Sequence, residues 1–224
     1  FELIAYTERE KVNDVLVSRN KELDPSKTNH PFIVGTSSVR RKALIKHYYP
    51  HLKTVEMRGN LQTRIRKMDE GVCDALLLAY AGVKRMGYED LIISELSTST
   101  FVPPVGQGCI AIEAATSLDV DLKDAIRRYV NNTESESALL AERAFLERME
   151  GGCSIPAFGH ATINGTKLVL TCGLVSLDGQ KIIKKSFIGE IDKAVELGYE
   201  AGQTVLESGG KELLMEIKKE QLSV

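Results

Sequence analysis

The chain has 224 residues, of which 43% are hydrophobic, and a formal net charge of -2 at pH 7. This length allows a sizeable core and favours one large or two ordinary domains, of which we expect two. A slightly acidic balance is unlike the basic surfaces that neutralise a phosphate backbone, so nucleic acid is not an expected partner.

The four cysteines are far apart in the sequence, with none of the close pairs that mark zinc sites or dithiol motifs. We therefore predict no metal site and a reducing, cytoplasmic location. The amino-terminal residues lack the apolar run of a signal peptide, and no segment reaches membrane-spanning length, so no membrane is expected as a partner. Because the sequence begins without Met inside an apparent strand, residues 1–6, we expect it to be a fragment. The cysteines are Cys73, Cys109, Cys153 and Cys172.

Residues 32–87 alternate short apolar runs with helical periodicity, which is typical of strand, loop and helix units around a mainly parallel sheet. The predicted strands are 32–34, 54–57 and 75–78, each followed by a helix. Residues 94–108 are polar and then rich in proline and glycine, which predicts a stiff crossing segment and hinge before a strand at 109–113.

The composition changes in the second half of the chain. Two helices are predicted, at 119–129 and 134–146, the second capped within the segment Asn131-Asn132-Thr133. Asn164-Gly165 and Asp178-Gly179 are hairpin signals between apolar runs, which predicts an antiparallel three-stranded sheet. Helices at 191–206 and 211–218 would then cover one face of that sheet. The predicted fold class is therefore α/β, with a mainly parallel sheet and a small carboxy-terminal α/β domain.

The loop Gly151-Gly152-Cys153-Ser154-Ile155-Pro156 directly follows a helix-like run over residues 134–150. The glycines remove side chains that would crowd the sulfur, and Pro156 prevents a following helix, so Cys153 is predicted at an accessible turn. A cysteine is more often a small buried hydrophobe than a reactive group. Nearby Arg143 and Arg148 would favour the thiolate, so we treat Cys153 as a candidate for covalent chemistry.

Polar loops at the strand ends form a second candidate site. Gly35-Thr36-Ser37-Ser38 ends one strand and opens a helix, where hydroxyls and free N–H groups favour an anion. For any one loop, the simpler interpretation is capping serines and solvated arginines. Strand ends of a parallel sheet share an edge, however, and several arginines at that edge predict a polyanionic, carboxylate-rich ligand. The arginines are Arg40, Arg41, Arg58, Arg64 and Arg85.

Two other functions fit part of this pattern. A non-catalytic small-anion binding module of the periplasmic-binding-protein type would use the same arginines, but it would not need the glycine-flanked Cys153. A cysteine-dependent hydrolase or transferase needs a base for its thiol, and none of the four histidines stands in a local motif that marks one.

Five segments together resemble the porphobilinogen deaminase family, also called hydroxymethylbilane synthases. They lie in the family order with family-like spacing, and the resemblance covers essentially the whole chain. The segments are VGTSSVRR (34–41), RGNLQTR (58–64), DALLLAYAGVKRMG (74–87), PPVGQGCIAIE (103–113) and ERAFLERMEGGCSIPAFGHA (142–161).

The resemblance implies a transferase of tetrapyrrole biosynthesis, the route to haem and other porphyrins. Such an enzyme joins four porphobilinogen molecules head to tail, releases ammonia at each step and yields hydroxymethylbilane. It also implies a dipyrromethane cofactor, itself made from substrate units, held by a thioether to Cys153. The residues that the resemblance assigns to the cofactor cleft are Arg40, Arg41, Arg58, Arg64, Thr36, Ser37, Ser38 and Gly59, with Arg85 and Gln107 at the substrate.

The resemblance further implies three domains, of which the first two are similar to periplasmic binding proteins and enclose the active cleft. Residues 1–10 and 106–129 would be parts of the first domain, 11–105 the second and 130–224 the third. The family's catalytic aspartate stands in a Lys-Asp-Val-Pro segment that this sequence lacks. The catalytic residue is therefore unassigned, and we expect these 224 residues alone to be inactive. The family suggests a monomer, although strands without sheet partners would make this chain prone to self-association.

Overall fold

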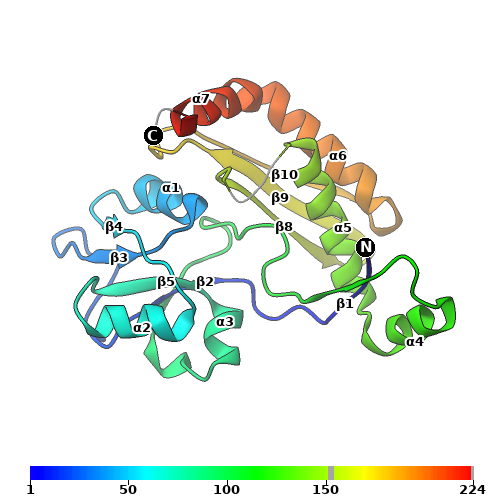
Figure 1. Cartoon of the computed structure of the whole chain (residues 1–224). Helices are drawn as coiled ribbons and strands as arrows, with labels where there is room; N and C mark the ends of the chain where they lie inside the picture. The colour runs from blue at the N-terminus through cyan, green and yellow to red at the C-terminus, as the bar shows by residue number, and fades with distance from the viewer. Residues whose placement is uncertain (151–153, 223–224) are drawn as a thin grey trace.

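The structure, a computed structural model, describes residues 1–150 and 154–222. Its strands form three sheets of five, three and two strands. In Figure 1 the five-stranded sheet and its helices lie at the lower left, and the three-stranded sheet lies above them under a layer of helices. The predicted α/β class, with a mainly parallel sheet and a three-stranded antiparallel sheet, is confirmed.

The five-stranded sheet runs in the order β4 (Lys53–Val55), β3 (Ile33–Gly35), β5 (Ala75–Ala79), β2 (Asp14–Val17) and β6 (Ile92–Glu95). β3 pairs in parallel with β4 and β5, as the repeated strand and helix pattern predicts. β2 and β6, which are not among the predicted strands, extend the sheet in antiparallel fashion. The carboxyl ends of β3, β4 and β5 therefore lie along one edge.

Each parallel strand leads into a helix: α1 (Val39–Tyr48), α2 (Leu61–Asp69) and α3 (Tyr80–Arg85). The first two helices begin at side-chain caps. Ser38 accepts a hydrogen bond from the N–H of Arg41, and Asn60 accepts one from the N–H of Thr63. A short 3-10 turn, η1 (Glu89–Leu91), then leads into β6.

The three-stranded sheet consists of β8 (Ala157–Asn164), β9 (Lys167–Val175) and β10 (Ile182–Glu190). All its pairs are antiparallel, and the two predicted turns connect them. Gly165 and Gly179 have positive φ angles in these turns, which glycine adopts without steric cost. β9 is one continuous strand between the two turns.

Helices cover one face of this sheet (Figure 1). α5 and α6 pack closely because Gly198 has no side chain: a Cβ there would lie 2.2 Å from the carbonyl oxygen of Ala141. The buried side chains of β9 pack against them in one core. The elements are α5 (Thr133–Arg148), η2 (Ile191–Lys193), α6 (Ala194–Val205), η3 (Leu206–Gly210) and α7 (Lys211–Leu222).

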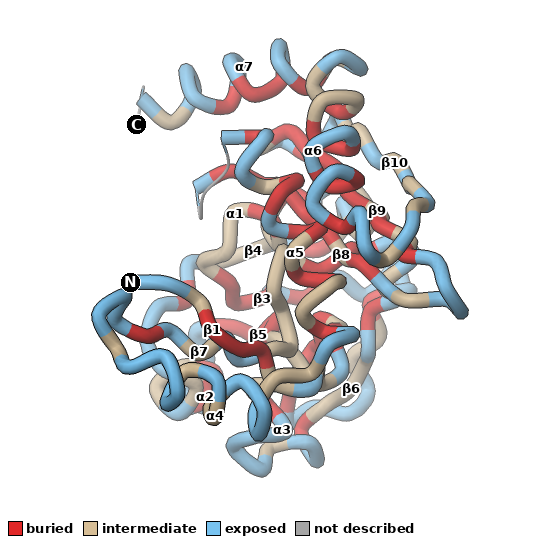
Figure 2. Tube along the Cα trace, turned by 90° about the vertical axis from the view of Figure 1, so that its right-hand side faces the viewer, coloured by how far each residue is buried: buried red, intermediate tan, exposed pale blue. Residues whose placement is uncertain are grey.

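A small outlying unit contains β1 (Glu2–Tyr6), β7 (Ala111–Ala114) and α4 (Val120–Val130). β1 and β7 form an antiparallel pair. All of α4 is described and none of its residues is buried, so Figure 2 shows it without red positions.

Two crossing segments, residues 7–13 and 103–110, connect this unit to the five-stranded sheet. They run side by side, because the N–H of Thr7 donates to the Ile110 carbonyl at 3.0 Å and the N–H of Glu10 donates to the Gly108 carbonyl at 2.8 Å. The second connection therefore overlaps the segment predicted as a hinge, and whether it acts as a hinge stays a prediction.

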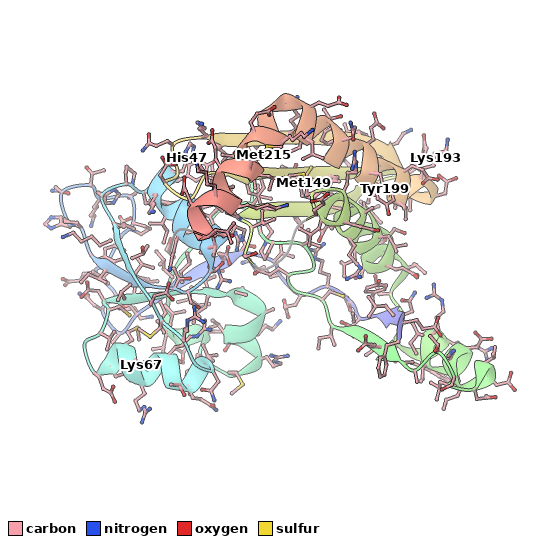
Figure 3. The ribbon with its side chains drawn as sticks, turned by 45° about the horizontal axis from the view of Figure 1, so that its top comes forward. His47, Lys67, Met149, Lys193, Tyr199 and Met215 are labelled. Atoms are coloured by element: carbon pink, nitrogen blue, oxygen red, sulfur yellow. The ribbon has the colours of Figure 1, made fainter. Side chains whose placement is uncertain are left out.

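The three-stranded sheet and the five-stranded sheet share a core. Phe158 and Val175 are buried in the same cluster as Leu44 and Phe101. Above this core, His47 of α1 lies next to the turn between β9 and β10, with Nδ1 2.7 Å from the Gly179 carbonyl oxygen (Figure 3). These contacts fix α1 between the two sheets.

Candidate functional site

Three loops converge at the carboxyl ends of β3, β4 and β5. The strands pair in parallel register, with Gly35 opposite Val55 and Leu76. The loops and helix starts that follow them carry nearly all the predicted ligand residues. This is the edge where open α/β sheets bind ligands.

A pocket of about 460 Å³ lies at this edge. Three of the predicted arginines, Arg41, Arg64 and Arg85, line it together with Gly59. Its remaining wall is mostly apolar and, among the described residues, includes no acidic side chain. A cationic pocket with an apolar wall suits a ring compound that carries carboxylates. The remaining lining residues are Asn60, Leu61, Gln62, Leu78, Ala79, Gly82, Val83 and Met86.

Arg64 is held at the pocket by the turn before α2. Its Nε donates to the Gly59 carbonyl at 2.8 Å. Gly59 has a φ of 126°, and a Cβ there would lie 2.8 Å from a methyl carbon of Thr63, so a larger residue would disturb this turn. Burial, with the nearby charge of Arg41, lowers the pKa of Arg64 from its ordinary value. The pocket therefore has a positive field.

Arg41 enters the pocket wall from α1 and is anchored by a carboxylate that is not among the residues predicted for the site. Asp14 is fully buried at the start of β2. Its Oδ1 accepts hydrogen bonds from Nε and Nη2 of Arg41 at 2.9 and 2.7 Å. Burial raises the pKa of Asp14, but the charges of Arg40 and Arg41 outweigh it and hold the pKa below its ordinary value. Asp14 is therefore ionised at neutral pH.

Arg40, adjacent in sequence, points away from the pocket and into the core. It is 4% exposed, and its Nη2 and Nη1 donate to Asp14 at 2.6 Å and to the Val102 carbonyl at 2.8 Å. Its guanidinium also lies 5.7 Å from the centre of the Phe101 ring. Burial lowers the pKa of Arg40 from its ordinary value. Ligand binding by Arg40 stays a prediction.

Gln107 connects the crossing segments to the same cluster. Its Nε2 donates to the Val12 carbonyl at 2.6 Å and to Asp14 at 3.2 Å. Its Oε1 accepts from Nη2 of Arg41 at 3.4 Å. Within the described chain Gln107 is not among the residues that line the pocket, so its predicted contact with substrate stays a prediction.

Four other predicted residues, Thr36, Ser37, Ser38 and Arg58, are not among those that line the pocket. Thr36 is 1% exposed, and its Oγ1 accepts from the N–H of Ser38 at 3.3 Å, which shapes the turn before α1. Ser37 is half-buried in that turn. Arg58 extends into solvent with an 84% exposed side chain, 3.7 Å from Glu56. Ligand contact by these four residues stays a prediction.

Cys153 lies outside the described residues, but both flanks of its loop contact α7. Lys218 pairs with Glu150 at 3.2 Å, and Nε2 of Gln221 donates to the Ser154 carbonyl at 2.5 Å. Covalent attachment needs a cysteine that can form a thiolate, so the thiol pKa values of the other cysteines show whether they could compete with Cys153.

Two of the remaining cysteines are poor nucleophiles. Burial raises the pKa of Cys73 to about 11 and that of Cys172 to about 12. Cys109 is half-buried beside Thr7, and the described cysteines are all free thiols. The described residues contain no cluster of ligands suited to a metal ion and no helix long and apolar enough to cross a membrane.

A second buried carboxylate lies away from the pocket, where the crossing segments meet α5 and β8. Glu142 accepts hydrogen bonds from Nη1 and Nη2 of Arg9 at 2.5 and 3.1 Å. It also accepts hydrogen bonds from the N–H groups of Gly106 and Ala161 at 2.8 and 2.7 Å. Burial raises the pKa of Glu142 above its ordinary value despite Arg9. Burial, together with Arg9, also lowers the pKa of nearby His160 to about 4.

The sequence carried a signal for both carboxylates. An acid at the head of the all-apolar run Val15-Leu16-Val17, or inside an apolar helix face, needs a cationic partner when buried. The local sequence does not indicate which residue is that partner.

Comparison with known proteins gives two family matches. Residues 1–123 match the model described as porphobilinogen deaminase, dipyromethane cofactor binding domain, and residues 137–207 match the porphobilinogen deaminase C-terminal domain. A porphobilinogen deaminase of Desulfosudis oleivorans is 56% identical over 221 residues, 99% of this chain and 71% of that relative. One from Cytophaga hutchinsonii is 52% identical over 217 residues, 97% of this chain and 69% of the relative. One from a Geobacillus species is 41% identical over 214 residues, which are 95% of this chain and 67% of the relative.

Proposed function

The chain belongs to the porphobilinogen deaminase family, and we propose that it serves the stepwise, head-to-tail condensation of four porphobilinogen units to hydroxymethylbilane, with release of ammonia. It is a transferase of tetrapyrrole biosynthesis with a dipyrromethane cofactor. The single structural observation that supports this function is the pocket lined by Arg41, Arg64 and Arg85. Neither comparison favours a non-catalytic binding module.

The residues present fit a dipyrromethane group. Its acetate and propionate side chains are carboxylates, and guanidinium groups bind carboxylates with paired, charge-assisted hydrogen bonds. We propose that Arg41 and Arg64 hold these carboxylates, that Arg85 receives those of the incoming substrate, and that the exposed Arg58 closes over them. When bound, the group supplies the pyrrole carbon to which new units are added.

The part of the chain described here binds and orients. The apolar wall formed by Leu61, Leu78 and Val83 would contact the pyrrole rings and exclude water, while the arginines neutralise the acid groups. We leave the group that handles protons during condensation unassigned, because the pocket is lined by no acidic residue among those described.

We propose the covalent attachment at Cys153. Cys73 and Cys172 are buried with raised thiol pKa values, whereas Glu150 and Ser154, the described residues on either side of Cys153, are exposed. We further propose the domain limits 1–10 with 106–129, 11–105 and 130–224, a monomeric protein and a cytoplasmic location.

Intact-mass measurement of the protein as purified from cells that make porphobilinogen tests the proposal, because these 224 residues alone are not expected to condense it in vitro. We expect an increase equal to two deaminated porphobilinogen units, which Cys153→Ser abolishes. The matched control Cys109→Ser changes a half-buried thiol in the crossing segment and should keep the increase. An unmodified protein, or an increase that survives Cys153→Ser, would contradict the assignment. A colour test for pyrroles on the same samples reports whether the attached group is present.

A further inference from the structure

We propose that Asp14 is a positioning residue of the pocket: its buried carboxylate fixes the guanidinium of Arg41 at the wall and leaves a single net positive charge on the cluster of Asp14, Arg40 and Arg41. This inference rests on the proposed function. It adds a residue that neither the sequence motifs nor the family matches assign.

The hydrogen bonds define how Arg41 is held. Nε and Nη2 both donate to Oδ1 of Asp14, Nη1 donates to the Leu77 carbonyl at 3.2 Å, and Nη2 also reaches Oε1 of Gln107 at 3.4 Å. These bonds use every N–H of the guanidinium except one on Nη1. Because Arg41 lines the pocket, that remaining donor is the one available to a ligand carboxylate.

Arg40 completes the cluster from the core side. Both of its terminal nitrogens are engaged, by Asp14 and by the Val102 carbonyl, and its Nε has no hydrogen-bond partner among the described residues. A cation buried with an unpaired donor is costly unless a carboxylate lies beside it. Asp14 is that carboxylate, and it accepts hydrogen bonds from both Arg40 and Arg41.

The cluster also couples the pocket to the crossing segments. Asp14 follows directly on residues 7–13, and Gln107 of the second segment bonds both Asp14 and Arg41. Arg9 donates through Nε to the Gln107 carbonyl at 2.9 Å. A shift of either segment would therefore move the anchor of Arg41.

A mutant cycle in porphobilinogen binding tests the positioning role. On a Cys153→Ser background, which prevents covalent uptake, titration calorimetry compares the parent with Asp14→Asn, Arg41→Gln and the double variant. Each single change should weaken binding about tenfold, the loss of one charge-assisted contact. The double variant should bind no more weakly than Arg41→Gln. Asp14→Asn binding like the parent, or independent losses in the double variant, would overturn the inference.

A second pair of variants tests the same proposal if the single variant Asp14→Asn does not fold. Asp14→Asn with Arg40→Met removes one charge of each sign from the core, a replacement that folded proteins tolerate. This double variant should bind porphobilinogen more weakly than Arg40→Met alone, because only the single variant keeps the anchor of Arg41. Equal binding by the two would contradict the proposal.

A ligand-free readout separates this inference from the proposed function. Phenylglyoxal modifies arginine, and peptide mapping gives the rate at each site. Arg41 should react faster in Asp14→Asn, while Arg64, which is held by the Gly59 carbonyl, should keep its rate. An unchanged rate of modification at Arg41 would contradict the positioning role of Asp14. A parent that fails to bind porphobilinogen, with the rates changed as expected, would instead contradict the function.

Discussion

Two buried carboxylates hold this molecule together, and they differ in one respect. Asp14 and Glu142 are both fully buried, and each accepts four hydrogen bonds. Asp14 faces two guanidiniums, whereas Glu142 faces that of Arg9 and two backbone N–H groups. Burial raises the pKa of both, but the charges beside Asp14 outweigh burial and the charge beside Glu142 does not.

The difference shows what each cluster is suited to do. Two cations around one carboxylate leave a positive charge, which is useful where Arg41 meets a pocket for anions. One cation around one carboxylate is neutral, which suits a joint between the crossing segments, α5 and β8. In this molecule, the buried carboxylate beside the pocket is the one whose cationic partners outnumber it.

The largest effect is expected at the neutral joint. Arg9→Met leaves Glu142 with backbone donors only, and loss of one partner of a buried pair costs about 3–5 kcal/mol. Urea denaturation should show this as a lower free energy of unfolding. The control Lys167→Ala breaks the exposed pair with Glu190 and should leave the midpoint unchanged. An Arg9→Met protein as stable as the parent would show that the joint contributes no stability.

A smaller effect is expected at the charged cluster. Arg40→Met leaves Asp14 bonded to Arg41 and Gln107, so about 1–2 kcal/mol should be lost, less than in Arg9→Met. The same urea experiment measures both variants. If Arg40→Met proves the more destabilising change, the remaining bonds from Arg41 and Gln107 to Asp14 do not compensate for the lost guanidinium.

The sequence predicted the edge of the sheet where the pocket lies. Each strand run ended in a polar loop, and parallel strands bring such loops together, so Arg41, Gly59, Arg64 and Arg85 share one pocket. The sequence did not separate Arg40 from Arg41. Neighbouring residues on a helix point in directions about 100° apart, and only the packing of α1 decides which faces the core.

The partners of the two buried carboxylates were beyond the reach of local pattern. Arg9 and Glu142 are 133 residues apart, and Asp14 and Gln107 are 93 apart. β2 was missed for a different reason: its four buried residues show no alternation that distinguishes a strand. These contacts depend on how the crossing segments meet the sheets.

Acid titration should give the two sites opposite signs. The pKa of Asp14 is lowered from 3.8, so its stabilisation is present above that value and is lost as pH falls through the folded pKa. The pKa of Glu142 is raised from 4.5, so its contribution is present below that value and is lost as pH rises through the folded pKa.

The measurement is the free energy of unfolding of the parent minus that of a neutral variant, followed against pH. For Asp14→Asn this difference should increase as pH rises from the acid limit. For Glu142→Gln it should decrease as pH rises above 4.5. Two differences that change in the same direction would mean that the guanidinium count does not decide the pKa, and the comparison would fail.

The smallest effect is expected where a guanidinium is not buried at all. Arg58 is 84% exposed and lies 3.7 Å from Glu56, a geometry in which ion pairs contribute little because water and salt screen them. Arg58→Ala should therefore keep the urea midpoint of the parent, yet it should weaken porphobilinogen binding more at low salt than at high salt. Arg58→Lys keeps the charge and should restore the salt dependence. A lower urea midpoint for Arg58→Ala would mean that exposed guanidiniums near the pocket stabilise the fold, and burial would no longer distinguish the structural arginines from those that only meet ligand.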